Sequence, residues 1–314
     1  MRLLGLGRRR ATTDRSSTIP AVRVGVIDVG ANTVRLLVAS REGAVREDRV
    51  QIGLGEEVER SGRLSRKKTL AAAETAAAHV RRARKLGCIS TEILVTSPGR
   101  QSANAGELIA ALHEATEAPV RVLSAEEEGM LAWHGAVSAA EDVPDPVAVC
   151  DVGGGSLQLT VGTVANGPAW TRSIDLGSLR LTRRAFEHDP PTESELARAR
   201  GEAAKRLADI APPLPRVALA TGGTARALRR VVGRTLGPAE LEEAIGCLAE
   251  RSSRAIADDY GVDKNRARTL TAGAILIAAV QRRIGVPFEV ARGGLREGAA
   301  LALLAHAESA ARTA

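Results

Sequence analysis

Aromatic residues and cysteines are scarce in this sequence of 314 residues. Phe, Trp and Tyr make up 2% of it, so the core must be aliphatic, and stacking platforms of the kind that single-strand nucleic-acid binders use are lacking. We therefore expect no nucleic-acid partner. The three cysteines, Cys88, Cys150 and Cys247, are odd in number and form no CxxC pair, which argues against disulfides and a zinc site. Cys150 lies in an apolar run and is expected in the core.

Long hydrophobic runs are also missing. No stretch approaches the roughly 18 apolar residues that a membrane span needs, so we expect no membrane association and a cytoplasmic location. Residues 1–20 are basic and rich in Ser and Thr, and we expect a disordered tail there. The net charge of +7, almost all from arginine, fits either an anionic partner or a bias in genome composition.

Apolar runs and helical patterns alternate along the chain, which predicts an α/β fold. Residues 51–65 carry glycines and charges and are expected to be a loop with a short strand, and residues 96–100 a Pro-Gly turn. The Pro- and Asp-rich stretch 141–147 is the best boundary candidate. We expect an N-terminal lobe over residues 21–140 and a C-terminal lobe over 141–314.

Two hairpins repeat one pattern of residues. The first reads DVGANTVRL from Asp28, and the second reads DVGGGSLQL from Asp151. In both, Gly follows the Asp by two positions, a hydroxyl by five and Leu by eight, and each hairpin follows an apolar strand. Two plain hairpins with Asp and Gly as turn formers are the alternative. Matched spacing at the head of each half favours a duplicated functional loop.

The residue types in these loops suit phosphate binding. Backbone N–H groups in a tight turn can converge on a phosphate where glycine leaves the approach open. Hydroxyls and amides add donors, and Mg²⁺, the usual companion of phosphate, prefers carboxylate and water oxygens. We expect Asp28 and Asp151 to bind the metal. The phosphate ligands expected in the two hairpins are Gly30, Asn32, Thr33, Gly153, Gly154, Gly155 and Ser156.

A third Gly-rich element, LATGGTARAL at 219–228, places Gly222, Gly223 and Thr224 between a strand and a helix. Free N–H groups at a helix start also bind anions, so we add these three residues to the phosphate ligands. Alone, the element would be an ordinary strand–helix turn.

The sequence resembles a known family over residues 22–305. The matching stretches are VIDVGANTVRLLVA, TSPGRQSAN, LSAEEEGMLAWHGAV, DVGGGSLQL, DLGSLRLTRRAF, ATGGTARAL and GLREGAAL, in this order. Together they are similar to the exopolyphosphatase / guanosine pentaphosphate phosphohydrolase (Ppx/GppA) family, within the actin, sugar-kinase and heat-shock ATPase superfamily.

The resemblance implies a two-lobed actin-like, ribonuclease-H-like ATPase fold with an active-site cleft between the lobes. It implies Mg²⁺-dependent release of the terminal phosphate from polyphosphate or guanosine pentaphosphate, and favours a homodimer. Glu128 matches the family's general base, and Arg100 a cleft arginine whose planar fork suits phosphate. Glu126 and Glu127 are expected only to complement the helix dipole. For Arg180 a family role and a plain surface position remain equally open.

The sequence also departs from the family pattern. Gln158 replaces a glutamate of the second loop, and the run Pro98-Gly99-Arg100-Gln101 replaces a pattern that includes an aspartate. The C-terminal His-Asp extension of long members has no counterpart, which implies a short form and makes short substrates more plausible. Since glutamine carries no charge, either slower hydrolysis or a binding protein with little turnover is open. A sugar kinase is the alternative at the level of the fold.

Overall fold

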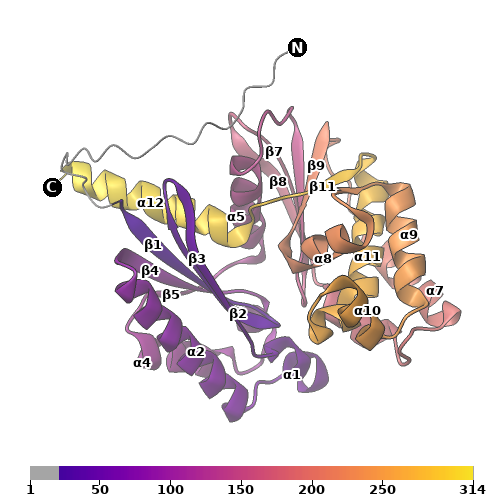
Figure 1. The fold of residues 1–314 in the computed structure, drawn as a ribbon, viewed down its shortest axis with the longest axis horizontal. Coiled ribbons are helices and arrows are strands. Elements are labelled where there is room, and N and C mark those ends of the chain that lie inside the picture. The colour runs from indigo at the N-terminus through magenta and orange to yellow at the C-terminus, as the bar shows by residue number, and fades with distance from the viewer. Residues whose placement is uncertain (1–20, 314) are drawn as a thin grey trace, which may run out of the picture.

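The computed structural model describes residues 21–313, so the expected tail at 1–20 lies outside the described residues. Two mixed sheets form two lobes (Figure 1). The first sheet has the strand order β3-β2-β1-β4-β5, and the second β10-β11-β9-β6-β7-β8. In each, an antiparallel hairpin is extended by parallel strands, since β1 pairs with β4 and β6 pairs with β9 in parallel. The repeat seen in the sequence is therefore a repeat of sheet topology.

The elements of the first half surround the five-stranded sheet. They are β1 (Arg23–Val29), β2 (Thr33–Ser40), β3 (Gly43–Gln51), α1 (Leu54–Ser61), α2 (Arg66–Lys85), β4 (Cys88–Val95), α3 (Ser97–Gln101), α4 (Ala105–Thr116), β5 (Val120–Val122) and α5 (Ala125–Ser138).

The elements of the second half surround the six-stranded sheet. They are β6 (Val147–Val152), β7 (Leu157–Thr163), β8 (Gly167–Ile174), α6 (Ser178–Ala185), α7 (Glu193–Arg206), β9 (Val217–Thr221), α8 (Gly222–Val232), β10 (Thr235–Leu236), α9 (Pro238–Ala249), α10 (Ser253–Tyr260), α11 (Lys264–Ile284), β11 (Phe288–Val290) and α12 (Leu295–Thr313).

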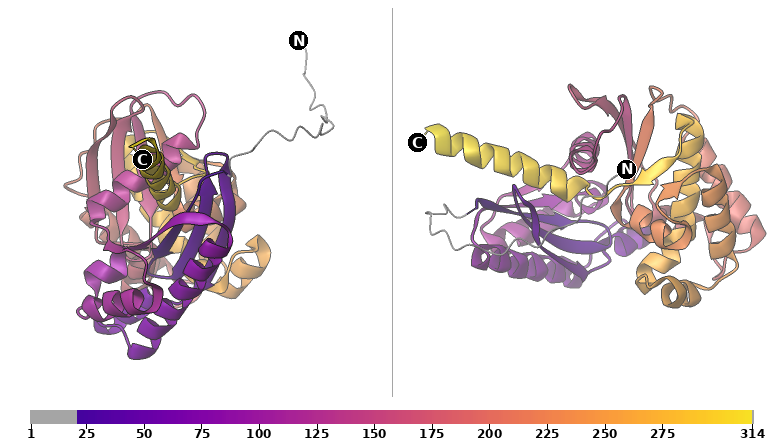
Figure 2. Two further views of the ribbon diagram at one scale, coloured as in Figure 1. Left: turned by 90° about the vertical axis from the view of Figure 1, so that its left-hand side faces the viewer. Right: turned by 45° about the horizontal axis from the view of Figure 1, so that its top comes forward.

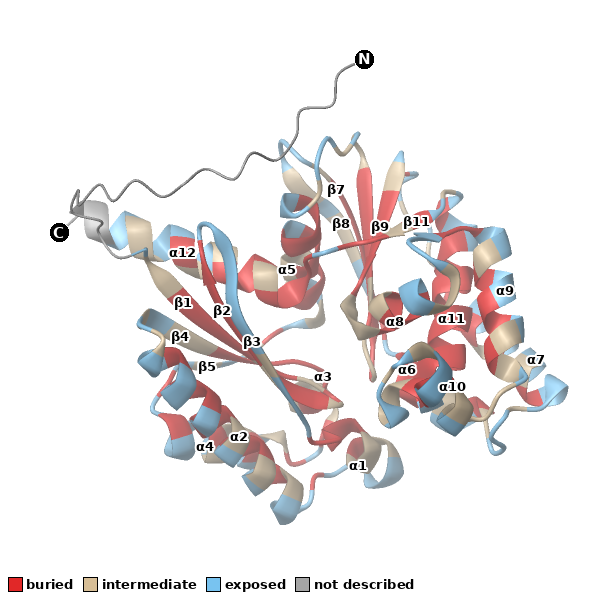
Figure 3. Ribbon diagram, viewed as in Figure 1, coloured by how far each residue is buried: buried red, intermediate tan, exposed pale blue. Residues whose placement is uncertain are grey.

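The core is aliphatic, as the scarcity of aromatics predicts. Helix α11 is buried along most of its 21 residues, through Ala, Ile, Leu and Val side chains (Figure 3). A helix that is apolar all round must lie inside the protein. Cys150 is fully buried on β6, as expected, and all three cysteines are free.

Helices α5 and α12 exchange places between the halves. Helix α5 follows the first sheet in sequence but packs against β6, β7 and β8, while α12 follows the second sheet and packs against β1 and β2. The two helices also contact each other closely (Figures 1 and 2). Glycine permits this approach, because a Cβ added to Gly135 would lie 1.9 Å from the carbonyl oxygen of Gly294. The predicted division at residues 140 and 141 stays a prediction.

Two local expectations are wrong. Residues 54–61, expected in a loop, form α1, in which Leu54 and Val58 lie on one buried face. Gly53 and Gly55 surround the first of these apolar residues and made the helical pattern hard to recognise. Residues 97–101, expected to turn, form the short helix α3 with proline in its first turn, where its missing N–H costs nothing. Strands β3, β8 and β10 and helices α6 and α10 were not predicted.

No helix within residues 21–313 has the length and apolar character to cross a membrane. The homodimer and the cytoplasmic location stay predictions.

Candidate active site

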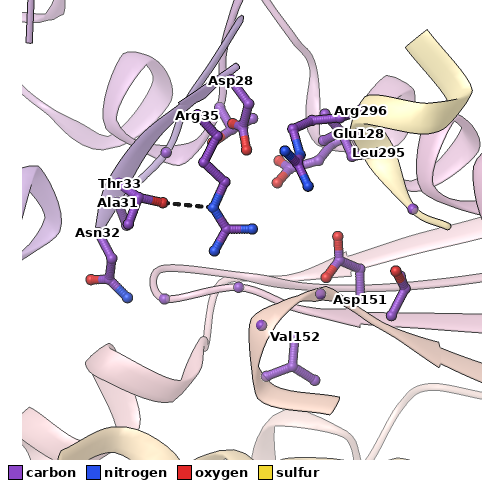
Figure 4. Close-up of a pocket in the computed structure, with 18 of the residues that line it drawn as sticks. Asp28, Ala31, Asn32, Thr33, Arg35, Glu128, Asp151, Val152, Leu295 and Arg296 are labelled. Carbon is purple, nitrogen blue, oxygen red and sulfur yellow. Dashed lines mark hydrogen bonds between the residues drawn. The ribbon is translucent and has the colours of Figure 1, made fainter. Parts of the chain in front are cut away.

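A cavity of about 100 Å³ lies between the two lobes, where the repeated hairpins face each other (Figure 4). The N-terminal turns of α5, α8 and α12 reach its wall, and such helix ends favour anions. Most of the residues expected at the site line this cavity: Asp28, Gly30, Asn32, Thr33, Glu128, Asp151, Gly153, Gly154, Ser156, Gly222 and Gly223. The remaining ones, Arg100, Gly155 and Thr224, lie behind the wall.

The two hairpin turns have the same backbone geometry. The amide of Gly30 donates to the carbonyl of Thr33 at 3.0 Å, and the amide of Gly153 donates to the carbonyl of Ser156 at 2.9 Å. In each case the Asp is the penultimate residue of the incoming strand. This common turn explains why the residue spacing repeats.

The glycines of the second hairpin also serve contact between the lobes. A Cβ on Gly154 would lie 3.1 Å from the Cβ of Ala31, and one on Gly155 would lie 2.6 Å from Oε1 of Gln101. Around Gly30, by contrast, no atom lies closer than 3.6 Å to an added Cβ. A side chain at Gly30 would therefore make ordinary van der Waals contacts, whereas one at Gly155 would clash with the other lobe.

The third Gly-rich element is shaped by the residues that it touches. Gly222 has φ 85°, and an added Cβ would lie 2.3 Å from Oδ1 of Asp151, so only glycine fits beside this carboxylate. The fully buried hydroxyl of Thr224 donates to the carbonyl of Val152 at 3.2 Å and accepts from Nη1 of Arg266 at 3.0 Å. Thr224 thus positions a loop and an arginine that line the cavity.

Glu128 lies in the first turn of α5, where Ser124 and Glu127 form a capping box. Its carboxylate pairs with Arg100, with 2.6 Å between Oε2 and Nη2, and Arg100 also donates to the carbonyl of Leu123 at 2.7 Å. Burial raises the pKa of Glu128 to about 7 against the opposing effect of Arg100. Arg100 therefore faces the predicted base.

Two further carboxylates are desolvated in the same cavity. Burial raises the pKa of Asp151 to about 6 and also raises the pKa of Asp28, while nearby arginines lower both. The negative charges of Asp151 and Asp28 in turn raise the pKa of Glu128. No group of three or more His, Cys, Asp or Glu side chains within residues 21–313 is arranged to hold a metal. Two aspartates suit an ion that takes its remaining ligands from substrate and water.

Four arginines that the sequence analysis missed also line the cavity: Arg35, Arg226, Arg266 and Arg296. Burial lowers the pKa of Arg35 and of Arg266 to about 10, and it lowers the pKa of Arg226 as well. The three side chains are half-buried, and within the described chain none of them forms an ion pair. Carboxylates at longer range, Asp28 for Arg35 and Asp263 for Arg266, stabilise their charged forms.

Among these four arginines, Arg35 belongs to the first of the two repeated hairpins. It extends from β2, donates from Nε to the hydroxyl of Thr33 at 3.0 Å, and points into the space between Asn32 and Asp151 (Figure 4). Its cross-strand partner is Asp28, and in the second hairpin the same register pairs Asp151 with Gln158. Comparing the two repeats position by position could have singled out Arg35.

Gln158 is 1% exposed and does not line the cavity. Its Nε2 donates to the hydroxyls of Ser156 at 3.0 Å and Ser173 at 3.2 Å, while its Oε1 is buried without a partner. It therefore acts on the cavity through Ser156.

Arg180 is buried rather than on the surface. Its Nε lies 2.6 Å from a carboxylate oxygen of Glu59, and its guanidinium also pairs with Asp175. Because Glu59 belongs to α1 and Arg180 to α6, this ion pair joins the two lobes beside the second hairpin.

Comparison with known proteins identifies relatives of this chain. The chain is 29% identical over 305 residues to exopolyphosphatase 1 of Mycobacterium tuberculosis, covering 88% of this chain and 87% of that protein. It is 28% identical to the Mycobacterium leprae exopolyphosphatase 1 over 305 residues, with 88% of each covered.

Solved structures show the same fold. The Aquifex aeolicus member of the Ppx/GppA family has a TM-score of 0.78 at 24% identity, covering 92% of this chain and 99% of that one. An exopolyphosphatase from Cytophaga hutchinsonii has a TM-score of 0.79 at 21% identity, covering 90% and 98%. The two lobes thus form an α/β actin-like ATPase fold, as predicted. The model of the Ppx/GppA phosphatase family matches residues 37–307, so the chain belongs to this family.

Proposed function

We infer that the protein is an exopolyphosphatase, which hydrolyses the terminal phosphoanhydride bond of inorganic polyphosphate. The observation that carries this proposal is the set of half-buried arginines that form no ion pair in the described chain, Arg35, Arg226 and Arg266, in a cavity that also holds Glu128. A polyanion would supply the missing counter-charges. The curated relatives named exopolyphosphatase support the same substrate class.

In the proposed reaction, Glu128 takes a proton from water as the water attacks the terminal phosphorus. A base is most effective when its pKa lies near the working pH, and the raised pKa of Glu128, about 7, meets that condition. Arg100 keeps the carboxylate oriented through the 2.6 Å contact. The loops and arginines would hold the terminal phosphate and stabilise the charge of the transition state.

Asp28 and Asp151 would hold Mg²⁺, since both line the cavity and two carboxylates suit an ion that also binds substrate phosphate. The ion would neutralise charge on the phosphates. Desolvation, which raises the pKa of both aspartates, would be relieved by a cation between them.

Guanosine pentaphosphate is the second candidate substrate. A cavity of about 250 Å³ shares Asn32 with the first and contains Phe186, Asn265 and Arg268, so an aromatic ring and an amide adjoin the phosphate loops. These are groups that bind a purine base. Direct competition between the two substrates would rank them.

Phosphate release from tripolyphosphate with Mg²⁺ tests the proposal. We expect Glu128→Gln to lower kcat by about 10² to 10⁴-fold, the range typical of a removed general base. Glu126→Gln is the matched control, because it removes the same charge from an exposed position of the same helix turn. Absence of release by the wild type, or equal rates for the wild type and Glu128→Gln, would refute the proposal.

A further inference from the structure

A second cavity, of about 320 Å³, adjoins the catalytic one on the side away from Glu128. The two share five wall residues, Arg35, Gly223, Arg226, Arg266 and Arg296, so their walls are continuous. The second cavity then extends between β3 of the first lobe and helices α8 and α11 of the second. It is a passage from the buried site to the surface.

The wall of this passage is dominated by arginine. Besides the four shared arginines it contains Arg49 and Arg230, against the acids Glu47, Asp48 and Asp263. Each acid already has a cationic partner: Arg296 with Glu47 at 2.9 Å, Arg46 with Asp48 at 2.7 Å, and Arg49 with Asp263 at 2.6 Å.

Arg230 has no carboxylate partner in the described part of the chain. Its Nη1 donates to the backbone carbonyls of Tyr260 and Gly261, which leaves its positive charge without a counter-ion. Together with Arg226, one helical turn earlier on α8, it forms a row of uncompensated positive charge that leads outward.

Among the described residues, no aromatic side chain lines the passage, and the only aliphatic side chains that line it are those of Ala227 and Val262. A nucleobase needs a stacking surface, whereas a linear polyphosphate needs only repeated positive charge. We propose that this passage binds the internal phosphates of a polyphosphate chain whose end is held in the catalytic cavity, and that the Arg49–Asp263 ion pair controls its outer end. The proposal rests on the proposed function.

The ion pair stands where the passage meets solvent. The side chains of Arg49 and Asp263 are 44% and 37% exposed, whereas Arg266, which also lines the catalytic cavity, is half-buried. Arg49 comes from β3 of the first lobe, and Asp263 caps α11 of the second by accepting from the amide of Arg266 at 2.9 Å. A chain longer than the passage must therefore displace this contact between the lobes, which makes it a determinant of chain length.

The test compares tripolyphosphate with long-chain polyphosphate as substrates. We expect Arg230→Ala to raise KM for the long chain about tenfold, the scale of one charge-assisted contact, and to leave KM for tripolyphosphate within twofold. Asp263→Asn retains the capping oxygen and frees Arg49, so KM for the long chain should fall several-fold. Arg229→Ala is the matched control, because it removes the same charge from the same helix, and Arg229 lines neither cavity.

Binding measurements separate this inference from the proposed function. Each variant is combined with Glu128→Gln and titrated with both polyphosphates and with guanosine pentaphosphate. A loss confined to long chains in the Arg230→Ala background supports the passage even if the wild type hydrolyses nothing. Equal losses for both chain lengths, the same loss with Arg229→Ala, or a loss seen only with guanosine pentaphosphate would overturn it.

Discussion

The two repeated hairpins have the same turn but present different chemistry to the cavity. Each closes with a glycine amide donating to the carbonyl three residues later, and each pairs its Asp with the residue seven positions on. In the first hairpin that residue is Arg35, a half-buried cation that lines the cavity. In the second it is Gln158, a buried amide that holds Ser156 and Ser173.

The glycines of the two hairpins also differ in what surrounds them. At Gly30 an added Cβ would make only ordinary van der Waals contacts, whereas Gly154 and Gly155 lie against Ala31, Ser97 and Gln101 of the other lobe. The first hairpin is thus specialised for charge, and the second for fit between the lobes. One backbone scaffold can therefore take two tasks after duplication, with few changes at matching positions.

The largest effect is expected when Arg35 of the first hairpin is replaced by glutamine, the residue at the matching position of the second hairpin. Arg35→Gln should lower kcat/KM for tripolyphosphate about a hundredfold or more, because it removes a preorganised charge from the anion site. The free energy of unfolding should change by no more than about 1 kcal/mol, because relief from desolvating the Arg35 charge opposes the loss of its attraction to Asp28. Arg46→Gln on the exposed strand β3 is the control. A large loss of stability would mean that Arg35 serves the fold instead.

A smaller effect is expected from replacing the glycines, and it should differ between Gly30 and Gly155. Gly30→Ala should leave the free energy of unfolding within about 0.5 kcal/mol but raise KM about tenfold, because its Cβ would occupy the space expected for phosphate. Gly155→Ala should cost about 1–3 kcal/mol, because its Cβ would press on Gln101 and Ser97. Thermal unfolding and initial rates measure both. The same pattern of losses in the two variants would contradict the division of tasks.

The smallest effect is expected for Gln158→Glu. The new buried carboxylate lies opposite Asp151 in the β6–β7 register and would raise the pKa of Asp151 further above about 6. An acid whose folded pKa exceeds its unfolded value costs stability above the unfolded pKa, so this variant should be about 1–2 kcal/mol less stable at pH 8 and approach the wild type only near pH 4, because the unfolded pKa of a carboxyl group is about 4. The acid limb of its pH–rate profile should move to higher pH.

Its rate at pH 8 should stay within about tenfold of the wild-type rate, since Gln158 acts through Ser156. A much larger gain in rate would instead favour the alternative that the wild-type protein binds its substrate with little turnover.

Sequence reasoning located the carboxylates and loops because their pattern is local. Asp28 and Asp151 end strands that the repeat aligns, and Glu128 lies in a short motif on which the family resemblance rests. The arginines escaped because their meeting depends on distant elements: Arg226 comes from α8, Arg266 from α11 and Arg296 from α12. The proposed phosphate role of Gly155 likewise ignored what the opposite lobe places beside it, which no local pattern records.

The exchange of α5 and α12 makes the two halves depend on each other to fold. Helix α5 carries Glu128 on the chain of the first half but covers the second sheet, and α12 carries Arg296 on the chain of the second half but covers the first. A cut within 141–146 would leave each fragment with an uncovered sheet and a helix that fits only the other fragment. Such fragments are natural partners for complementation, and activity would report their reassembly.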